Sequence, residues 1–393
     1  MKKLLLLVIA CILVTSCGTQ GDPADPTEQG NESEESMSVL TDEITTSPPS
    51  TTAPETDPPE VIPPASFVLQ FEPGREGIYN YCPTVITEAD GTRYIYYCTN
   101  KESYKVIDYI GCRKGTPNAD GSYTWSEETV VLSPSTDGAW DAHHTCDPSV
   151  IKGKFSYGGK DYAYLMAYLG CTSYDNQENK IGLAVANSPM GPFIKIGDKP
   201  LVDFKLDPAV TFFQWGVGQP SLVSIDKAGK AWLFYTRGDK NGTRVVVCEC
   251  DFSNLDSPTL KSEKALSVNG LKNLNGGNDF MNNADFAYDP VKDRFYSASD
   301  CHPNPTTVPD YIAGSFRVNY MNGTGLTSGY WRMTATVGIK ETGEPRNHNV
   351  GLARDEYGHL PQNGYLTVYY TVSKTGNDSL WSYRIYEYSI KVK

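Results

Sequence analysis

Five short stretches of the chain share one order of polar and apolar positions. Each has a polar residue, then a Pro or another small or aliphatic residue, then mostly a small, hydroxyl or acidic residue, and then apolar residues. The five stretches are 80–86, 146–151, 217–223, 282–288 and 347–352. Equivalent positions recur every 64 to 72 residues. A constant period of this length predicts that the chain repeats one kind of structural unit.

Each of these stretches is followed by a turn rich in Gly, Asp or Asn and by an aromatic run, such as 93–97 or 232–236. Two apolar runs joined in this way predict a β-hairpin. A third strand follows, and the period leaves room for a fourth. We therefore predict an all-β chain whose residues 65–393 form a five-bladed β-propeller, with 66–71 closing the ring beside the C-terminal strands. The alternative is a two-sheet sandwich with coincidental Pro spacing.

The first residues are typical of an export signal. Lys2 and Lys3 precede an apolar run over 4–14, which is short for a membrane span and leads to Cys17. This pattern predicts a lipoprotein signal peptide at 1–16 and a lipid on Cys17, which would make the protein an extracytoplasmic, membrane-anchored bacterial lipoprotein. The alternative is an ordinary secretory signal with a chance Cys.

Residues 17–64 begin with Cys17 and continue as a segment with eleven Asp and Glu, no Lys or Arg, and many Ser, Thr and Pro residues. Such a composition cannot bury enough apolar surface to fold, so we predict a disordered acidic tether. The rest of the chain carries a net charge of only about −4, which gives no reason to expect a nucleic-acid partner. We expect a monomer.

Ten Cys residues include eight beyond the export signal. Export permits disulfides, but their connectivity cannot be derived from the sequence. No C-x-x-C pair occurs, so we expect no structural zinc site.

In a propeller, the repeated stretches would be the innermost strands, and their first polar residues would surround one axis at one end of the channel. These residues are Cys82, Asp147, Gln219, Asn283 and Asn349. A polar side chain at all five places indicates a polar pocket, although a purely structural channel would also be polar.

The chain resembles the family 43 glycoside hydrolases and related five-bladed propeller enzymes that act on furanosides and xylosides. The resemblance rests on Asp147-Pro148-Ser149-Val150-Ile151, on Gly191-Pro192-Phe193, and on Pro220-Ser221-Leu222 with the run at 232–236. It implies three carboxylates: an Asp base on the first blade, an Asp on the second that orients and tunes the acid, and a Glu acid on the third. Asp147 matches the second, whereas Cys82 and Gln219 occupy the other two places.

Neither a thiol nor an amide can replace a carboxyl group in glycoside hydrolysis. Other carboxylates are therefore needed for catalysis. Asp285 follows Asn283 by two residues and so should point toward the channel from the same strand, and Asp141 precedes the second inner strand, where a loop could hold it over the mouth. Further candidates near strand ends, each with a surface β-turn as the commoner explanation, are Asp207, Asp239, Asp300 and Glu344.

Several side chains could contact a sugar. Trp140 and Trp215 flank inner strands and could stack on a sugar ring or pack between blades, and His144 could contact hydroxyls. Arg346 could clamp a hydroxyl or carboxylate. In the resembled family the position of His348 lies near an axial metal ion, so the resemblance implies a possible structural calcium in the channel; no cofactor is required.

The leading hypothesis is a surface-anchored glycoside hydrolase for poly- or oligosaccharides, with arabinose- or xylose-type glycosides favoured, Asp147, Asp285 and Asp141 as catalytic groups, and Trp140, His144, Trp215, Gln219, Asn283, Arg346 and Asn349 as substrate contacts. The main alternative is a non-catalytic glycan-binding lipoprotein on a decayed hydrolase scaffold. A structural, partner-binding propeller has the least support, because it would not require a ring of Asp, Asn, Gln and His.

Overall fold

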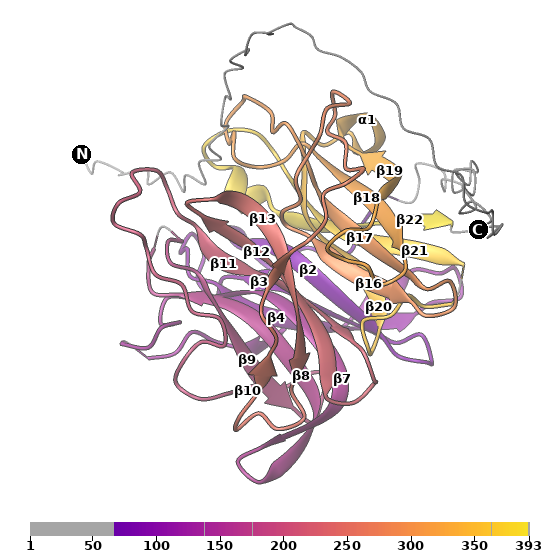
Figure 1. Cartoon of the computed structure of the whole chain (residues 1–393). Helices are drawn as coiled ribbons and strands as arrows, with labels where there is room; N and C mark the ends of the chain where they lie inside the picture. Colours follow the sequence, from indigo (N-terminus) through magenta and orange to yellow (C-terminus); the bar gives the residue numbers. More distant parts are fainter. Residues whose placement is uncertain (1–66, 137, 175, 363, 392–393) are drawn as a thin grey trace, which may run out of the picture. The chain divides into compact units, whose positions relative to one another are not determined.

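The computed structural model describes residues 67–136, 138–174, 176–362 and 364–391. The predicted signal peptide, Cys17 and the tether lie outside these residues. The described residues form antiparallel sheets arranged as the blades of a five-bladed propeller (Figure 1). In the described part of the chain, no helix has the length and apolar character needed to cross a membrane.

The first three blades follow one another along the chain, each beginning with its innermost strand. Blade 1 has β2 (Asn80–Thr87), β3 (Arg93–Thr99), β4 (Tyr109–Pro117), β5 (Tyr123–Trp125) and β6 (Thr129–Leu132). Blade 2 has β7 (His144–Tyr157), β8 (Lys160–Cys171), β9 (Lys180–Ala186) and β10 (Ile194–Lys195). Blade 3 has β11 (Gly216–Ser224), β12 (Lys230–Asp239), β13 (Gly242–Asp251), β14 (Thr259–Leu260) and β15 (Lys264–Ala265).

The last two blades complete the ring. Blade 4 has β16 (Asp285–Asp289), β17 (Arg294–Cys301), β18 (Ser315–Asn322) and β19 (Arg332–Val337), followed by the short helix α1 (Ile339–Thr342). Blade 5 has β20 (Arg346–Asp355), β21 (Tyr365–Ser373), the 3₁₀ turn η2 (Ser379–Ser382), β22 (Arg384–Lys391) and, from the N-terminal side, β1 (Val68–Leu69).

Two pairings close the ring. β1 is hydrogen-bonded antiparallel to β22, as predicted for residues 66–71. The inner strands β20 and β2 also pair in parallel, with Val85 opposite Ala353. Gly351 permits this close approach, because a Cβ there would lie 1.8 Å from the carbonyl oxygen of Pro83.

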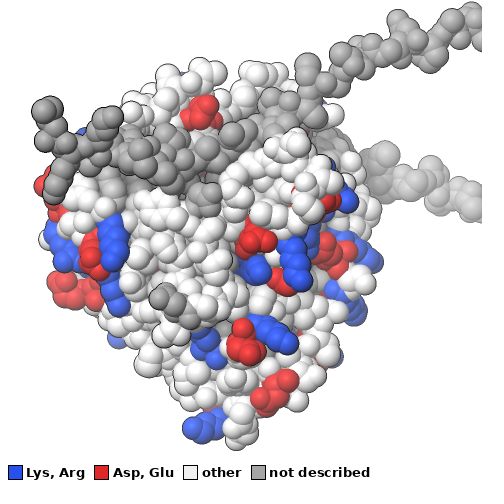
Figure 2. Space-filling model, turned by 90° about the vertical axis from the view of Figure 1, so that its left-hand side faces the viewer, with Lys and Arg blue, Asp and Glu red and all other residues white. Residues whose placement is uncertain are grey.

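The hydrophobic core lies between neighbouring blades. Separate clusters of buried residues occupy each of the five interfaces, for example Leu165 with Leu233 between blades 2 and 3 and Phe316 with Tyr370 between blades 4 and 5. The aromatic second strands supply much of this packing. On the face in Figure 2, Lys and Arg side chains lie interspersed with Asp and Glu rather than in a patch of one sign.

Candidate functional site

The five predicted axial residues adopt the same unusual backbone conformation. Cys82, Asp147, Gln219, Asn283 and Asn349 have φ between 45° and 50°, the left-handed region that non-Gly residues rarely enter and that Asn and Asp tolerate best. Register shifts in the inner hairpins of blades 1, 2, 3 and 5 fall at these positions. A bulge of this kind can re-aim a side chain, and these five side chains all line one pocket.

Hydrogen bonds connect successive members of this axial ring. The Oδ2 atom of Asp147 accepts the backbone N–H of Gln219 at 3.2 Å, and Oε1 of Gln219 accepts that of Asn283 at 2.9 Å. In blade 4 the acceptor comes from a second strand: Asp300 on β17 accepts the N–H of Asn349 at 3.2 Å and the Asn283 side-chain amide at 2.5 Å. The ring side chains therefore hold the bulged backbones together.

A second polar layer lies one step further along the inner strands and is centred on Arg354. Its guanidinium is fully buried and contacts Oγ1 of Thr84 at 3.0 Å, Oγ of Ser149 at 3.2 Å, Oγ of Ser221 at 3.3 Å and Oδ1 of Asp285 at 3.2 Å. These four partners come from blades 1 to 4, and Arg354 itself comes from blade 5. The cation therefore cross-links all five inner strands.

Above the axial ring is a pocket of about 220 Å³ with a lining from all five blades. It includes three carboxyl groups, those of Asp108, Asp147 and Asp300, together with Trp215 and His348. Asp108 precedes β4, where it accepts a hydrogen bond from the Tyr79 hydroxyl at 2.7 Å and pairs with Nδ1 of His144 at 2.8 Å.

Burial raises the pKa of two of these carboxyl groups. The pKa of Asp147 rises to about 6, chiefly by desolvation, while a hydrogen bond from the Cys82 thiol opposes the rise. The pKa of Asp300 rises to about 7, again chiefly by desolvation, against the hydrogen bond from Asn283. Carboxyl groups with such pKa values in a pocket are candidates for proton transfer at neutral pH.

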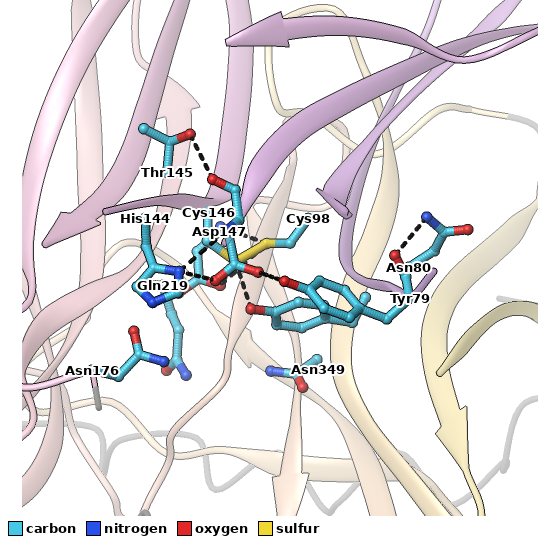
Figure 3. The surroundings of a disulfide bond; sticks show 12 residues. Tyr79, Asn80, Cys98, His144, Thr145, Cys146, Asp147, Asn176, Gln219 and Asn349 are labelled. Carbon is cyan, nitrogen blue, oxygen red and sulfur yellow. Dashed lines mark hydrogen bonds and ion pairs between the residues drawn. A yellow bond between two sulfur atoms is a disulfide. The ribbon is translucent and has the colours of Figure 1, made fainter. Parts of the chain in front are cut away.

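Asp147 lies directly beside a disulfide. Cys98 on β3 and Cys146 on β7 are bonded, with Cα atoms 5.1 Å apart, and so join blades 1 and 2 (Figure 3). The Asp147 N–H lies 3.0 Å from Sγ of Cys98, and the Tyr81 hydroxyl lies 3.2 Å from Sγ of Cys146. The disulfide thereby fixes the segment that carries Asp147.

The structure brings some of the predicted residues together. Asp147, Gln219, Asn283, Asn349, Trp215 and His348 all line the pocket, with Cys82 beside them. Burial lowers the pKa of His348 to about 3, so its imidazole is neutral at neutral pH. Asp300, named only among further candidates, and Asp108, which was missed, also line it.

Other predicted residues have different surroundings. Asp141 is buried in blade 2, where Oδ2 accepts from the Tyr168 hydroxyl at 2.9 Å and pairs with Nζ of Lys195 at 2.5 Å. Trp140 stacks on Tyr168 with ring centroids 5.7 Å apart. Neither belongs to the pocket lining that the described residues define. We therefore do not assign a catalytic role to Asp141 or a sugar contact to Trp140.

Three further predicted residues are absent from the pocket lining that the described residues define. Asp285 faces the channel as expected, but in the deeper layer, where it accepts the N–H of Leu352 at 2.8 Å and pairs with Arg354. Arg346 is buried and donates to the backbone carbonyls of Thr307 and Pro309, not into the pocket. His144 is linked to the pocket by its ion pair with Asp108, which lines it.

The structural calcium suggested by the position of His348 stays a prediction. Calcium takes six to eight oxygen ligands, whereas Nδ1 of His348 is hydrogen-bonded to Asn349 and the ring packs against Tyr383. Among the described residues, the one group of His, Cys, Asp and Glu side chains close enough to share a metal does not include His348; it consists of Cys82, Cys98, Cys146 and Asp147. We assign no catalytic step to calcium.

No protein-family model and no curated protein matches the chain. Several solved structures share its fold. A family 117 glycoside hydrolase from Zobellia galactanivorans aligns with a TM-score of 0.54 at 13% identity, over 83% of this chain and 89% of that one. An α-L-arabinofuranosidase from Podospora anserina, in complex with cellotriose, gives 0.52 at 11% identity over 83% and 95%.

A GH43_1 enzyme from Xanthomonas citri, complexed with xylotriose, gives a TM-score of 0.52 at 12% identity over 84% of this chain and 94% of that one. At such identities the likeness concerns the fold. The predicted five-bladed β-propeller and its resemblance to family 43 are thus confirmed at the level of the fold, and the two-sheet sandwich is excluded.

Proposed function

We propose that this protein hydrolyses glycosidic bonds in poly- or oligosaccharides by general acid/base catalysis in the axial pocket. The observation that carries the proposal is the pair of buried carboxyl groups, Asp147 and Asp300, which share one pocket and both have raised pKa values. They come from blades 2 and 4, which blade 3 separates, so the pair approaches a ligand on the axis from different sides. Glycoside hydrolysis needs two carboxyl groups placed in this way.

The pKa values suggest which group has which role. Asp300, with a pKa of about 7, keeps its proton longer as pH rises and is suited to protonate the leaving oxygen. Asp147, with a pKa of about 6, loses its proton first and is suited to activate water. Asp300 thereby replaces Asp285 in the predicted set of catalytic carboxyl groups.

Arabinose- or xylose-type glycosides are the substrate class that we favour. A cavity of about 220 Å³ is smaller than the sites of about 300–1,000 Å³ that hold drug-sized ligands, which suits one or two sugar rings at a chain end. The Trp215 indole offers an apolar face for such a ring. Solved neighbours described as an arabinofuranosidase and as a xylotriose complex support the same class.

We further propose that the enzyme works outside the cytoplasm on a lipid anchor at Cys17. This proposal rests on the sequence of residues 1–17. Replacing Cys17→Ala should move the protein from the membrane fraction to the soluble extracytoplasmic fraction. Retention of the variant in the membrane fraction would contradict the lipid anchor.

The activity is tested by incubating the protein with arabinofuranosides, xylosides and their oligosaccharides and measuring new reducing ends. Asp147→Asn and Asp300→Asn should each lower kcat by about a hundredfold or more, and the surface variant Asp207→Asn should not. The pH profile of kcat/KM should be a narrow bell with limbs near pH 6 and 7, because the base must be ionised and the acid protonated. Unchanged turnover in both pocket variants would refute the assignment.

One observation favours a second function, glycan binding without hydrolysis. The places of the first and third family carboxylates hold Cys82, whose thiol pKa is raised by burial and by Asp147, and Gln219. Both side chains are neutral at pH 7. Stoichiometric binding of an oligosaccharide, with no new reducing ends for any glycan tested, would establish this function instead.

A further inference from the structure

Three cysteines and one aspartate meet at the base of the pocket. One ligand atom from each of Cys82, Cys98, Cys146 and Asp147 lies within 4.8 Å of every other. The residues come from three strands, β2, β3 and β7, in two neighbouring blades. Because the ligands come from separate strands, the sequence contains no C-x-x-C pair, and the cluster could not be predicted from such a motif.

The geometry points to a second state of this cluster: we propose that, once the Cys98–Cys146 disulfide is reduced, the three thiols and the Asp147 carboxylate bind one thiophilic divalent cation of the Zn²⁺ class. A thiol or a phosphine supplies the two electrons and is itself oxidised, to a disulfide or with water to a phosphine oxide, leaving two thiols on the chain. Zn²⁺ then replaces the protons of the thiols, which pass to solvent.

The distances fit such a site. Tetrahedral zinc with Zn–S bonds of about 2.3 Å has ligand atoms about 3.8 Å apart. Oδ1 of Asp147 already lies 3.3 Å from Sγ of Cys146 and 3.9 Å from Sγ of Cys98. Once the sulfur–sulfur bond is broken, rotation of the two side chains can bring the sulfurs to the spacing of zinc ligands.

Two polar groups lie beside the sulfurs of Cys98 and Cys146. The Asp147 N–H is directed at Sγ of Cys98 and the Tyr81 hydroxyl lies beside Sγ of Cys146. Such outer contacts tune metal ligands in known sites. Cys82, Cys146 and Asp147 line the open pocket, so a cation can enter from solvent. Three sulfur ligands favour zinc or another thiophilic ion over calcium or magnesium.

Asp147 would have a different role in the oxidised chain and in the reduced, metal-loaded chain. In the oxidised chain the Asp147 carboxylate is available in the pocket, and in the reduced, metal-loaded chain it is a ligand. Loss of hydrolysis on zinc binding would follow, and this consequence alone rests on the proposed function. Binding itself is tested without any sugar.

The experiment uses the full chain, oxidised or reduced anaerobically with a phosphine that is then removed, and titrated with Zn²⁺ and Co²⁺. We expect the reduced chain to bind one Zn²⁺ and to give the intense charge-transfer absorption of Co²⁺–thiolate bonds, and the oxidised chain to give neither. If the reduced chain is unfolded, one equivalent of Zn²⁺ should restore its circular dichroism. Failure of the reduced chain to bind stoichiometrically would overturn the proposal.

Variants show whether this cluster is responsible. Cys82→Asn should keep the local backbone, because Asn283 and Asn349 occupy the equivalent positions with nearly the same φ. It should weaken zinc binding by at least about tenfold. The control is Cys250→Ser, which disrupts the close thiol pair of Cys248 and Cys250, 3.6 Å apart in blade 3. Equal binding by both variants, or loss only in the control, would refute the assignment.

Discussion

Replacing Asp300 by Asn should stabilise the protein at alkaline pH even though it removes a proposed catalytic group. Asn has nearly the shape of Asp, and its Oδ1 can still accept the backbone N–H of Asn349. The neighbouring Asn283 now donates to Asp300, and its own Oδ1 is buried without a partner among the described residues. A flip of the Asn283 amide would let this oxygen accept a hydrogen bond from the amide introduced by Asp300→Asn, so the hydrogen bond between residues 283 and 300 can be kept.

The expected gain follows from the pKa of Asp300. Burial raises it from its ordinary 3.8 to about 7, and about 1.4 kcal/mol corresponds to each unit. Below pH 3.8 the carboxyl is protonated in both folded and unfolded chains and costs nothing. Between pH 3.8 and 7 the folded state binds more protons than the unfolded state, so stability falls as pH rises. Above pH 7 the cost reaches about 4 kcal/mol, which the Asn variant avoids.

The assay is urea unfolding of the oxidised wild-type and Asp300→Asn chains across about pH 4 to 8. The two free energies of unfolding should agree to within about 1 kcal/mol at pH 4 and diverge by up to about 4 kcal/mol at pH 8, with the variant more stable. A variant that is equally destabilised at both ends of the range would show that the pKa of Asp300 is not raised. Active-site groups whose removal stabilises a protein are a known trade-off.

Two further substitutions test the channel. Arg354→Met should lower the free energy of unfolding by about 3–5 kcal/mol, because it leaves the buried Asp285 charge unpaired. Adding Asp285→Ser should restore part of the loss, and urea unfolding of both variants checks this; no recovery would contradict the ion-pair explanation. Gly351→Ala should cost about 3 kcal/mol or more, because its Cβ would meet the Pro83 carbonyl. Gly325→Ala, with its nearest atom 3.9 Å away, is the control, and equal thermal stability of the two variants would contradict the tight contact.

The periodic part of the site could be predicted from the sequence. One inner strand per period placed Cys82, Asp147, Gln219, Asn283 and Asn349 around an axis, and the structure has them there. The residues outside this repeat, Asp300 and Asp108, could not be assigned to the site from the sequence. Asp300 lies near the end of a second strand, β17, and Asp108 stands in a loop before β4; nothing in either local pattern separates them from the surface Asp residues of ordinary turns. Their partners, and the raised pKa of Asp300, depend on contacts between blades, which spacing along the chain does not encode.

The different depths of Asp147 and Asp285 follow from the bulge. Alternation along a strand predicts that residues two apart share a face, and Asp285, the first residue of β16, does face the channel two residues after Asn283. At about 3.3 Å per residue of extended backbone, Asp285 lies about 7 Å beyond Asn283, and so falls in the layer of Ser149 and Ser221. There a carboxylate balances the Arg354 cation and is fully hydrogen-bonded. In this propeller, position relative to the left-handed bulge therefore separates groups that can meet a ligand from groups that hold the inner strands together.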